Sequence, residues 1–217
     1  MANRPVFLPL KSKTSYVREL SIEFQWFAGM SVSQKQKSIV SLHEATRKRL
    51  GDTNILEISS KSKEPLGVQL SAFNLKVPLD NRLVAVEVAF QAGKVFEKGG
   101  PFLDLLDGTS RDAKGDVRLQ ASGRLIGFTL SGESWPLTPR TAFYDWIYLR
   151  ALVANPDLAE QLLEYQAFTD IEFNPEKSLN CQARTAALYV SLHQEGILDK
   201  ALSDKAAYLN ILRGPTV

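Results

Sequence analysis

Reactive and hydrogen-bonding side chains recur at helical spacing in the segment VEVAFQAGKVF. Glu87, Gln91 and Lys94 lie at positions i, i+4 and i+7, and Lys98 follows at i+11. A helix over residues 85–98 would therefore place all four on one stripe. The other positions are mostly apolar, so we expect a largely buried helix. Its polar stripe would face either solvent, which is the commoner arrangement, or a cleft. Glu87 and Lys94 would lie about 10 Å apart along the axis, too far for an ion pair but able to approach one ligand from two ends.

A second candidate acid, Asp145, lies in an apolar helix predicted over residues 139–154 (RTAFYDWIYLRALV). A carboxylate in such company must be hydrogen-bonded or line a pocket, because burying it without partners costs too much free energy. Asp145 is therefore either a structural residue bonded to a backbone amide or part of a site. Its neighbour Trp146 is most simply a core residue, although an aromatic ring beside an acid could also form a wall for a purine base.

Polar residues also gather in the segment FTDIEFNPEKSLNCQA, which is predicted to be a loop that leads into a helix. Asp170 and Asn180 are its main candidates. A helix N-terminus preceded by polar residues can bind an anion such as phosphate. Asn180 could equally be no more than the N-cap of the helix, and the pattern alone favours this second interpretation.

The elements that must position these residues follow from periodicity and capping signals. Ser31 and Gln34 suggest a capping box at the start of one helix, which ends before Gly51. Thr138 and Pro139 suggest the start of another. The predicted helices cover residues 31–50, 85–98, 111–120, 139–154, 157–165, 180–196 and 200–212, and the predicted strands or extended segments cover residues 16–27, 55–59, 66–77 and 124–130. Helix dominates, so we expect a helix-rich α+β fold in one domain.

The composition excludes several classes of protein. The chain has 217 residues, 44% of them hydrophobic, which suffices for a sizeable core. Its single Cys excludes an internal disulfide framework and a Cys-based zinc site, and two His leave little for a His-rich metal centre. With 26 Lys+Arg against 24 Asp+Glu, nucleic-acid binding driven by bulk charge is disfavoured, although a local basic groove is not. The absence of a signal peptide and of long apolar runs predicts a cytoplasmic protein with no membrane contact. We expect no cofactor and no metal.

Four segments, in order, resemble the signatures of the NADAR family. They are LSAFNL (70–75), VEVAFQAGKVF (86–96), FYDWIYLRAL (143–152) and SLNCQARTAALYVSL (178–192). The second is the most specific, because Glu87, Phe90, Gln91 and Lys94 all match the family pattern Glu-x-x-Phe-Gln-x-x-Lys. Ala72 stands where the family usually has Asn, and the Leu-Gly pair usual after Asn180 is replaced. The resemblance covers roughly residues 66–195 and implies a fold of the NADAR (YbiA-like) type.

The first 60 residues go beyond the minimal family domain and resemble the NADAR subgroup associated with DarT-type DNA ADP-ribosyltransferase toxins. This resemblance implies an N-terminal extension over residues 1–60, with strands and a helix at about 31–50, packed on a catalytic domain over residues 61–217. It implies an antitoxin that removes ADP-ribose from guanine bases in DNA. The implied partners are ADP-ribosylated DNA, ADP-ribose as product and a DarT-type toxin.

The resemblance also implies roles for the candidate residues. Lys94 would act as nucleophile or electrostatic stabiliser, with Gly93 beside it leaving room for a ligand, and Glu87 would act as acid/base. Two routes stay open: a glycosidase-like displacement in which a carboxylate steers water, and attack of the Lys94 amine on the opened sugar to form a Schiff base. The implied catalytic residues are Glu87, Lys94 and Asp145, and the implied ligand-binding residues are Phe73, Asn74, Phe90, Gln91, Trp146, Asp170 and Asn180.

Two other functions compete with this one. A related enzyme could cleave the N-glycosidic bond of a phosphoribosyl-linked intermediate of riboflavin synthesis, although the N-terminal extension argues mildly against it. A non-enzymatic inhibitor could simply bind and block its toxin. Activity on isolated ADP-ribosylated DNA, with no toxin present, would separate both enzymes from the inhibitor.

Overall fold

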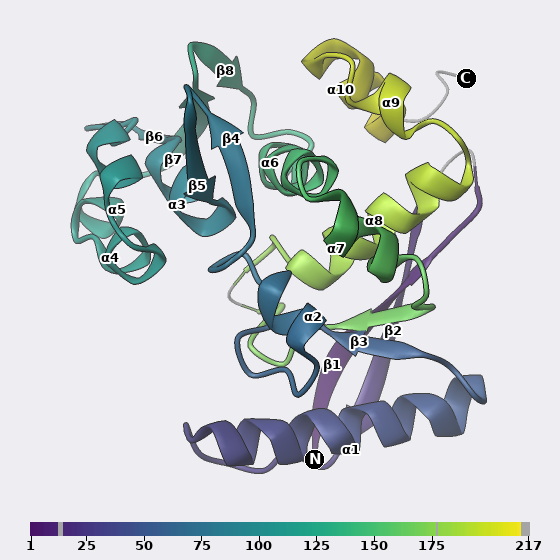
Figure 1. The fold of residues 1–217 in the computed structure, drawn as a ribbon. Helices are drawn as coiled ribbons and strands as arrows, with labels where there is room; N and C mark the ends of the chain where they lie inside the picture. Colours follow the sequence, from purple (N-terminus) through teal and green to yellow (C-terminus); the bar gives the residue numbers. More distant parts are fainter. Residues whose placement is uncertain (13–14, 177, 214–217) are drawn as a thin grey trace. The chain divides into compact units, whose positions relative to one another are not determined.

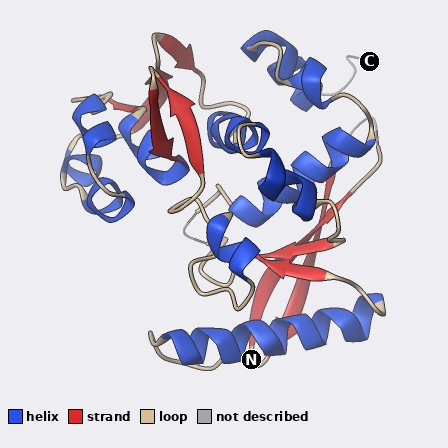
Figure 2. Cartoon of the chain, in the orientation of Figure 1, coloured by secondary structure: helices blue, strands red, loops and turns tan. Residues whose placement is uncertain are grey.

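The computed structural model describes residues 1–12, 15–176 and 178–213, and these segments form an α+β fold, as predicted (Figures 1 and 2). The chain divides into two compact units. Unit 1 combines Met1–Ser71 with the chain from Pro156 onward, and unit 2 is Ala72–Asn155. The functional division at residue 60 stays a prediction.

Unit 1 is built on a four-stranded sheet with the order β2-β1-β9-β3. Strands β1 and β2 are antiparallel, with Ala2 opposite Phe24 and Pro9 opposite Val17, whereas β9 runs antiparallel to β1 and parallel to β3. The strands of unit 1 are β1 (Ala2–Pro9), β2 (Val17–Phe24), β3 (Ile55–Glu57) and β9 (Ala167–Thr169). Its helices are α1 (Val32–Leu50), α2 (Pro65–Gln69), α7 (Pro156–Leu162), α8 (Gln182–Gln194), α9 (Leu198–Ala201) and α10 (Lys205–Arg213).

Apolar alternation explains how the sheet of unit 1 packs. In β2 every second residue from Leu20 to Phe24 is buried, as a strand with one covered face requires. The middle of β1 is buried on both faces, since α8 packs against β1 and α1 packs against β2 (Figure 1). The core cluster on the α1 side consists of Val6, Leu20, Ile22, Phe24, Ile39, Leu42, Ile55, Ala167 and Ile171.

Unit 2 contains a hairpin, a three-stranded antiparallel sheet and several short helices. The hairpin turns at Asp80 and Asn81, whose φ angles of 45° and 66° are those of a tight two-residue turn. Its strands are β4 (Lys76–Leu79) and β5 (Arg82–Ala85), and the sheet has the order β6 (Lys94–Phe96), β7 (Leu125–Leu130), β8 (Glu133–Trp135). Its helices are α3 (Val86–Ala92), η1 (Leu103–Asp107), α4 (Ser110–Gly115), α5 (Arg118–Ala121) and α6 (Ala142–Val153).

The helix predicted over residues 85–98 is wrong in its second half. Helix α3 ends at Ala92, and Lys94 is the first residue of β6. The carbonyl oxygen of Gly93 accepts a 2.7 Å hydrogen bond from the Thr129 amide, and Lys94 pairs with Phe128 of β7. The predicted common stripe therefore holds for Glu87 and Gln91 but not for Lys94 and Lys98.

Other predicted boundaries also shift for local reasons. Ser31 does cap α1, accepting from the Gln34 amide at 3.4 Å, but the Gln34 carboxamide oxygen has no donor among the described residues, so only half of the capping box is established. The predicted extended segment 66–77 is wrong at its start, because Pro65 opens helix α2 there. Helix α6 begins at Ala142 rather than at Pro139. The segments 111–120 and 200–212 each form two short helices instead of one.

Candidate functional site

A buried carboxylate–amide pair occupies one side of α3 in unit 2. Glu87 and Gln91 are 7% and 6% exposed, and Gln91 Nε2 donates a 3.0 Å hydrogen bond to Glu87 Oε1. The remaining oxygen of Gln91, Oε1, is buried and has no donor among the described residues. Because an unsatisfied buried acceptor costs free energy, this oxygen is a natural contact for a hydrogen-bond donor of a ligand.

Lys94 joins this pair from β6 rather than from the helix. Its ammonium lies 4.7 Å from the centroid of the Phe90 ring. Burial lowers the pKa of the Lys94 amine, the neighbouring Glu87 charge raises it, and the positive charge of Lys114 lowers it again. The balance is a lowered pKa, which increases the fraction of neutral, nucleophilic amine.

Lys114, on α4, completes the cluster and was missed by sequence reasoning. Its Nζ lies 4.0 Å from Glu87 Oε1 and 5.1 Å from the centroid of the Phe73 ring. Phe73 is 37% exposed, and the Lys114 side chain is 61% exposed. The cluster therefore has a cationic and aromatic rim. Nothing in the local sequence distinguishes Lys114 from other surface lysines, so only the folded chain identifies it.

Local hydrogen bonds hold α4 in this position. Thr109 and Asp112 form a complete capping box: Asp112 N donates to Thr109 Oγ1 at 3.2 Å, and Thr109 N donates to Asp112 Oδ2 at 3.3 Å. The hydroxyl of Ser110, the first residue of α4, donates to the Phe73 carbonyl oxygen at 3.0 Å. This last bond ties the turn that carries Phe73 directly to the helix that carries Lys114.

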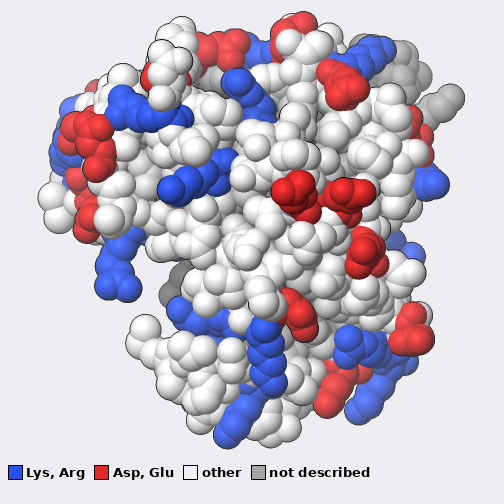
Figure 3. All heavy atoms as spheres, in the orientation of Figure 1, with Lys and Arg blue, Asp and Glu red and all other residues white. Residues whose placement is uncertain are grey.

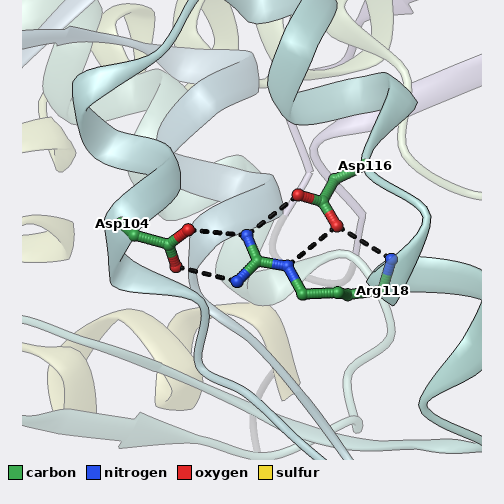
Figure 4. Close-up of polar contacts among 3 residues, drawn as sticks. All are labelled: Asp104, Asp116 and Arg118. Atoms are coloured by element: carbon green, nitrogen blue, oxygen red, sulfur yellow. Dashed lines mark hydrogen bonds and ion pairs between the residues drawn. The ribbon is translucent and has the colours of Figure 1, made fainter.

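Just beyond α4, Arg118 links two acids (Figure 4). Its guanidinium donates to both oxygens of Asp104, at 2.6 and 3.2 Å, and to both oxygens of Asp116, at 2.9 and 3.0 Å. Single exposed ion pairs contribute little to stability, but a guanidinium that holds two carboxylates fixes geometry as well. The network joins η1 to α5 and so limits the movement of the α4–α5 segment.

Aromatic rings pack around the base of the cluster. The Phe90 ring centroid lies 5.2 Å from that of Tyr144 and 5.7 Å from that of Phe128. The space beside Gly93, expected to admit a ligand, is filled instead by Phe143, since a Cβ at Gly93 would lie 2.7 Å from Phe143 Cζ. Gly93 is thus needed for packing between α6 and the end of α3.

Two further candidates, Asp145 and Trp146, lie on α6 with little exposure. Asp145 is 1% exposed, and its backbone amide donates to the Thr141 carbonyl oxygen at 2.9 Å. Trp146 is 8% exposed and packs on Trp135, with ring centroids 5.3 Å apart. This burial agrees with the expected apolar surroundings of α6. Asn74, in contrast, is exposed.

Asp170 and Asn180 belong to unit 1. Asp170 Oδ1 accepts hydrogen bonds from the amides of Glu172 and Phe173, at 3.0 and 3.2 Å. Burial, and secondly the Glu57 charge, raise the pKa of Asp170 to about 8. Asn180 is not the N-cap of α8, because the helix begins at Gln182 with Cys181 in the cap position. Its buried Oδ1 has no donor among the described residues.

Glu57, which sequence reasoning also missed, anchors the same part of unit 1. Its carboxylate accepts hydrogen bonds from Ser59 Oγ at 2.7 Å, Thr169 Oγ1 at 2.6 Å and the Ile171 amide at 2.8 Å. Its pKa is raised, chiefly by burial. His43 Nε2 lies 2.9 Å from the same Thr169 hydroxyl. The one available signal was a glutamate within the otherwise apolar strand sequence ILEI.

Neither a metal centre nor a membrane span is evident in the described segments. They contain no group of three or more His, Cys, Asp or Glu side chains placed to hold a metal ion. None of the helices within these segments combines the length and apolar character needed to cross a bilayer.

These features define an α+β protein with a carboxylate–amine cluster set among aromatic rings, a site suited to a ligand that combines negative charge with a ring system. The family described as DarT1-associated NADAR antitoxin matches residues 2–216, nearly the whole chain. The chain belongs to this family of antitoxins, so the resemblance drawn from four short segments, and the toxin-associated subgroup, are confirmed. No significant match exists among curated proteins.

Proposed function

We propose that this protein is an ADP-ribosyl hydrolase that removes ADP-ribose from guanine bases in DNA and so reverses the modification made by a DarT-type toxin. The observation that carries the proposal is the cluster on α3 and β6. There, a buried carboxylate, Glu87, acts electrostatically on Lys94, whose amine has a lowered pKa. Membership of the antitoxin family supports the same function.

The bond to be broken joins the anomeric carbon of ribose to the exocyclic nitrogen of guanine. In the covalent route, the sugar ring opens and the neutral Lys94 amine adds to the anomeric carbon. The carbon–guanine bond then breaks, guanine leaves as the free amine after gaining a proton, and an imine to Lys94 is left. Water hydrolyses this imine to release ADP-ribose. The net reaction consumes one water and regenerates the lysine.

Glu87 is the residue placed to move protons in this reaction. As an acid it would protonate the departing guanine nitrogen, and as a base it would activate the water that follows. Its hydrogen bond from Gln91 Nε2 holds the carboxylate in one orientation. In the alternative route Glu87 directs water at an oxocarbenium-like carbon, and Lys94 acts only through its charge.

The surroundings suit the remaining parts of the substrate. Phe73 and Lys114 combine an exposed ring with a cation, which fits a base next to a phosphate. Asp145 would orient the ribose, and Phe90 and Trp146 would contribute apolar surface. Asp170 and Asn180 lie in unit 1, and the ligand contacts that the family resemblance implies for them stay predictions. These assignments are part of the proposal.

The test is incubation of the protein with an oligonucleotide that carries ADP-ribose on a guanine, without toxin. We expect stoichiometric release of free ADP-ribose and recovery of unmodified guanine. Glu97→Gln is the matched control, because Glu97 is another glutamate of unit 2 but is exposed and paired with Arg124. It should retain full activity.

Two outcomes would contradict the proposal. If no ADP-ribose is released while the protein still blocks its toxin at a one-to-one ratio, the protein is an inhibitor by binding. If it releases ribose phosphate from a phosphoribosyl-linked riboflavin precursor but does not release ADP-ribose from DNA, it is a glycosidase of small metabolites.

A further inference from the structure

A partly exposed tryptophan lies at a corner of unit 1 where three elements meet. Trp26 follows β2, and its ring is approached by two cations: the guanidinium carbon of Arg4, on β1, lies 5.2 Å from the ring centroid, and Lys35 Nζ, on α1, lies 5.0 Å from it. The chain's other two tryptophans, Trp135 and Trp146, are 4% and 8% exposed. Trp26 is therefore the tryptophan that is open to solvent.

Backbone hydrogen bonds fix the segment that presents this ring. The amide of Gln25 donates to Ser41 Oγ at 3.1 Å, and the amide of Phe27 donates to Ser38 Oγ at 3.0 Å. Both serines lie on α1. The Trp26 ring also packs edge-on to Phe24, with centroids 6.2 Å apart. The ring is thus held in place before any ligand arrives, which reduces the entropic cost of binding.

Among the described residues, no carboxylate lies within ion-pair distance of either cation. Within the described residues neither Arg4 nor Lys35 forms an ion pair, and Arg4 donates only to the neighbouring Asn3 carbonyl oxygen, at 2.9 Å. Arg4 Nε is buried and has no acceptor in the same part of the chain. An unsatisfied buried donor is costly and calls for an explanation. A phosphate oxygen would satisfy it.

Helix α1 extends the positive charge away from this corner. Its residues include Lys35, Lys37, Arg47, Lys48 and Arg49, against a single acid, Glu44. The whole chain has a formal net charge of only +2, so the basic character is local. Figure 3 shows Lys and Arg side chains, with Asp and Glu side chains among them, over the part of unit 1 where α1 lies.

We propose that Arg4, Trp26 and Lys35 form a binding site for single-stranded DNA. A base packs against the solvent-exposed part of the Trp26 ring, and the two cations contact the phosphates on either side of it. Because 5.2 and 5.0 Å are measured to one centroid, the cations lie within about 10 Å of each other, close enough to contact the phosphates on either side of one nucleotide. Aromatic platforms flanked by cations bind single strands without sequence preference.

This inference rests on the proposed function, because it gives the N-terminal segment the task of holding the strand that carries the modified guanine. Single-stranded DNA is favoured over a protein partner by the unpaired cations and the orphaned Arg4 Nε–H, which match a polyanion. It is favoured over a free nucleotide because cations from two elements, β1 and α1, flank one ring and can contact the phosphates on both sides of a base.

The experiment measures binding of an unmodified oligothymidylate, so that it does not depend on hydrolysis. We expect the oligonucleotide to quench tryptophan fluorescence, since its bases reach only the exposed ring. A labelled strand followed by anisotropy gives the affinity. Arg4→Gln, Lys35→Gln and Trp26→Leu should each weaken binding by about tenfold, as expected for one stacked base or one phosphate contact. Trp26→Leu should also abolish the quenching.

Lys48→Gln is the matched control, because Lys48 is an exposed cation about 20 Å along α1 from Lys35. It should change the affinity by less than twofold. The proposal is overturned if the Arg4 and Lys35 variants bind the strand as tightly as the wild type, or no more weakly than the Lys48 variant. It is also overturned if these variants lose binding to the toxin but keep binding to DNA. Thymidine monophosphate as a competitor at equal nucleotide concentration should displace the strand poorly; equal competition would indicate a mononucleotide site.

The same variants separate this inference from the proposed function. If hydrolysis occurs but the Arg4 and Lys35 variants bind the strand normally, the proposed DNA-binding site is wrong and the proposed function stands. If the strand binds through Trp26 but no ADP-ribose is released from modified DNA, the proposed function fails and the DNA site stands.

Discussion

Lys114 Nζ lies 4.0 Å from Glu87 Oε1, so a lysine of a short surface helix contacts the buried acid of α3. Burial is the main cause of the lowered pKa of the Lys94 amine, the Glu87 charge raises it, and the positive charge of Lys114 offsets part of that rise. Neutral amine is what attack on a sugar aldehyde requires. The position of Lys114 on α4 therefore affects the reactivity that we propose for Lys94 on β6.

Replacing Glu87 with Gln should remove most of the hydrolysis while keeping the fold, because Gln is nearly isosteric but cannot carry a proton to the leaving group. A single general acid/base contributes about 10²–10⁴-fold. The rate of ADP-ribose release from modified DNA measures the effect, and circular dichroism checks the fold. A Gln variant within about threefold of the wild-type rate would show that Glu87 has no such role.

Lys94→Arg distinguishes the two chemical routes. A guanidinium keeps the positive charge but cannot form an imine, so the covalent route predicts an inactive variant. In the wild type, borohydride added during turnover should trap ADP-ribose on Lys94, which peptide mass spectrometry would locate. An active Arg variant together with no trapped peptide would exclude the covalent route and leave Lys94 with an electrostatic role.

Lys114→Gln should shift the pH dependence of the reaction. Lys114 lowers the pKa of Lys94, so its removal raises that pKa and leaves less neutral amine at any given pH. The rising limb of the pH–rate profile should move to higher pH, while Lys114→Arg, which restores the charge, should move it back. Amine-reactive labelling of Lys94 without substrate gives the same titration independently of turnover. Identical profiles for the Gln variant and the wild type would remove Lys114 from this role.

Asp170→Asn should change how stability depends on pH. In the folded protein the pKa of Asp170 is raised to about 8 by burial and by Glu57, against an ordinary value of 3.8. Between these values the folded state binds more protons than the unfolded state, so the free energy of unfolding falls as pH rises from about 4 to about 8. Asn carries no charge, and its oxygen can still accept from Glu172 and Phe173. We expect the wild type to lose stability relative to the variant as the pH rises through this range, by up to about 1.4 kcal/mol for each pH unit.

Denaturant unfolding between pH 6.5 and 9 tests this prediction. The window avoids His43, whose pKa is lowered to about 4 by burial and by Arg47. His43 contributes stability that is present above pH 6.5 and lost as the pH falls toward 4, the opposite slope. If the Asn variant and the wild type lose stability in parallel above pH 6.5, Asp170 does not titrate in that range.

Local sequence signals predicted the structure correctly where residues within one helical turn determine it. Ser31 and Gly51 bound α1 as predicted, because capping and helix termination depend on residues three or four positions away. The side-by-side placement of Glu87 and Gln91 also follows from helical spacing alone. The burial of α6 follows from its nearly continuous apolar sequence, which leaves no face for solvent.

Contacts between residues far apart in the chain determined the features that the sequence did not predict. Lys94 leaves the helix because Gly93 and β6 hydrogen-bond to β7, about thirty residues away in the chain, and no local pattern encodes that partner. The approach of Lys114 to Glu87 depends on the packing of α4 against α3. The sequence by itself thus identified the residue types and the family signature that belong to the site. Only the tertiary structure decided which element carries each of them, because strand pairing and helix packing are set by contacts between segments far apart in the chain.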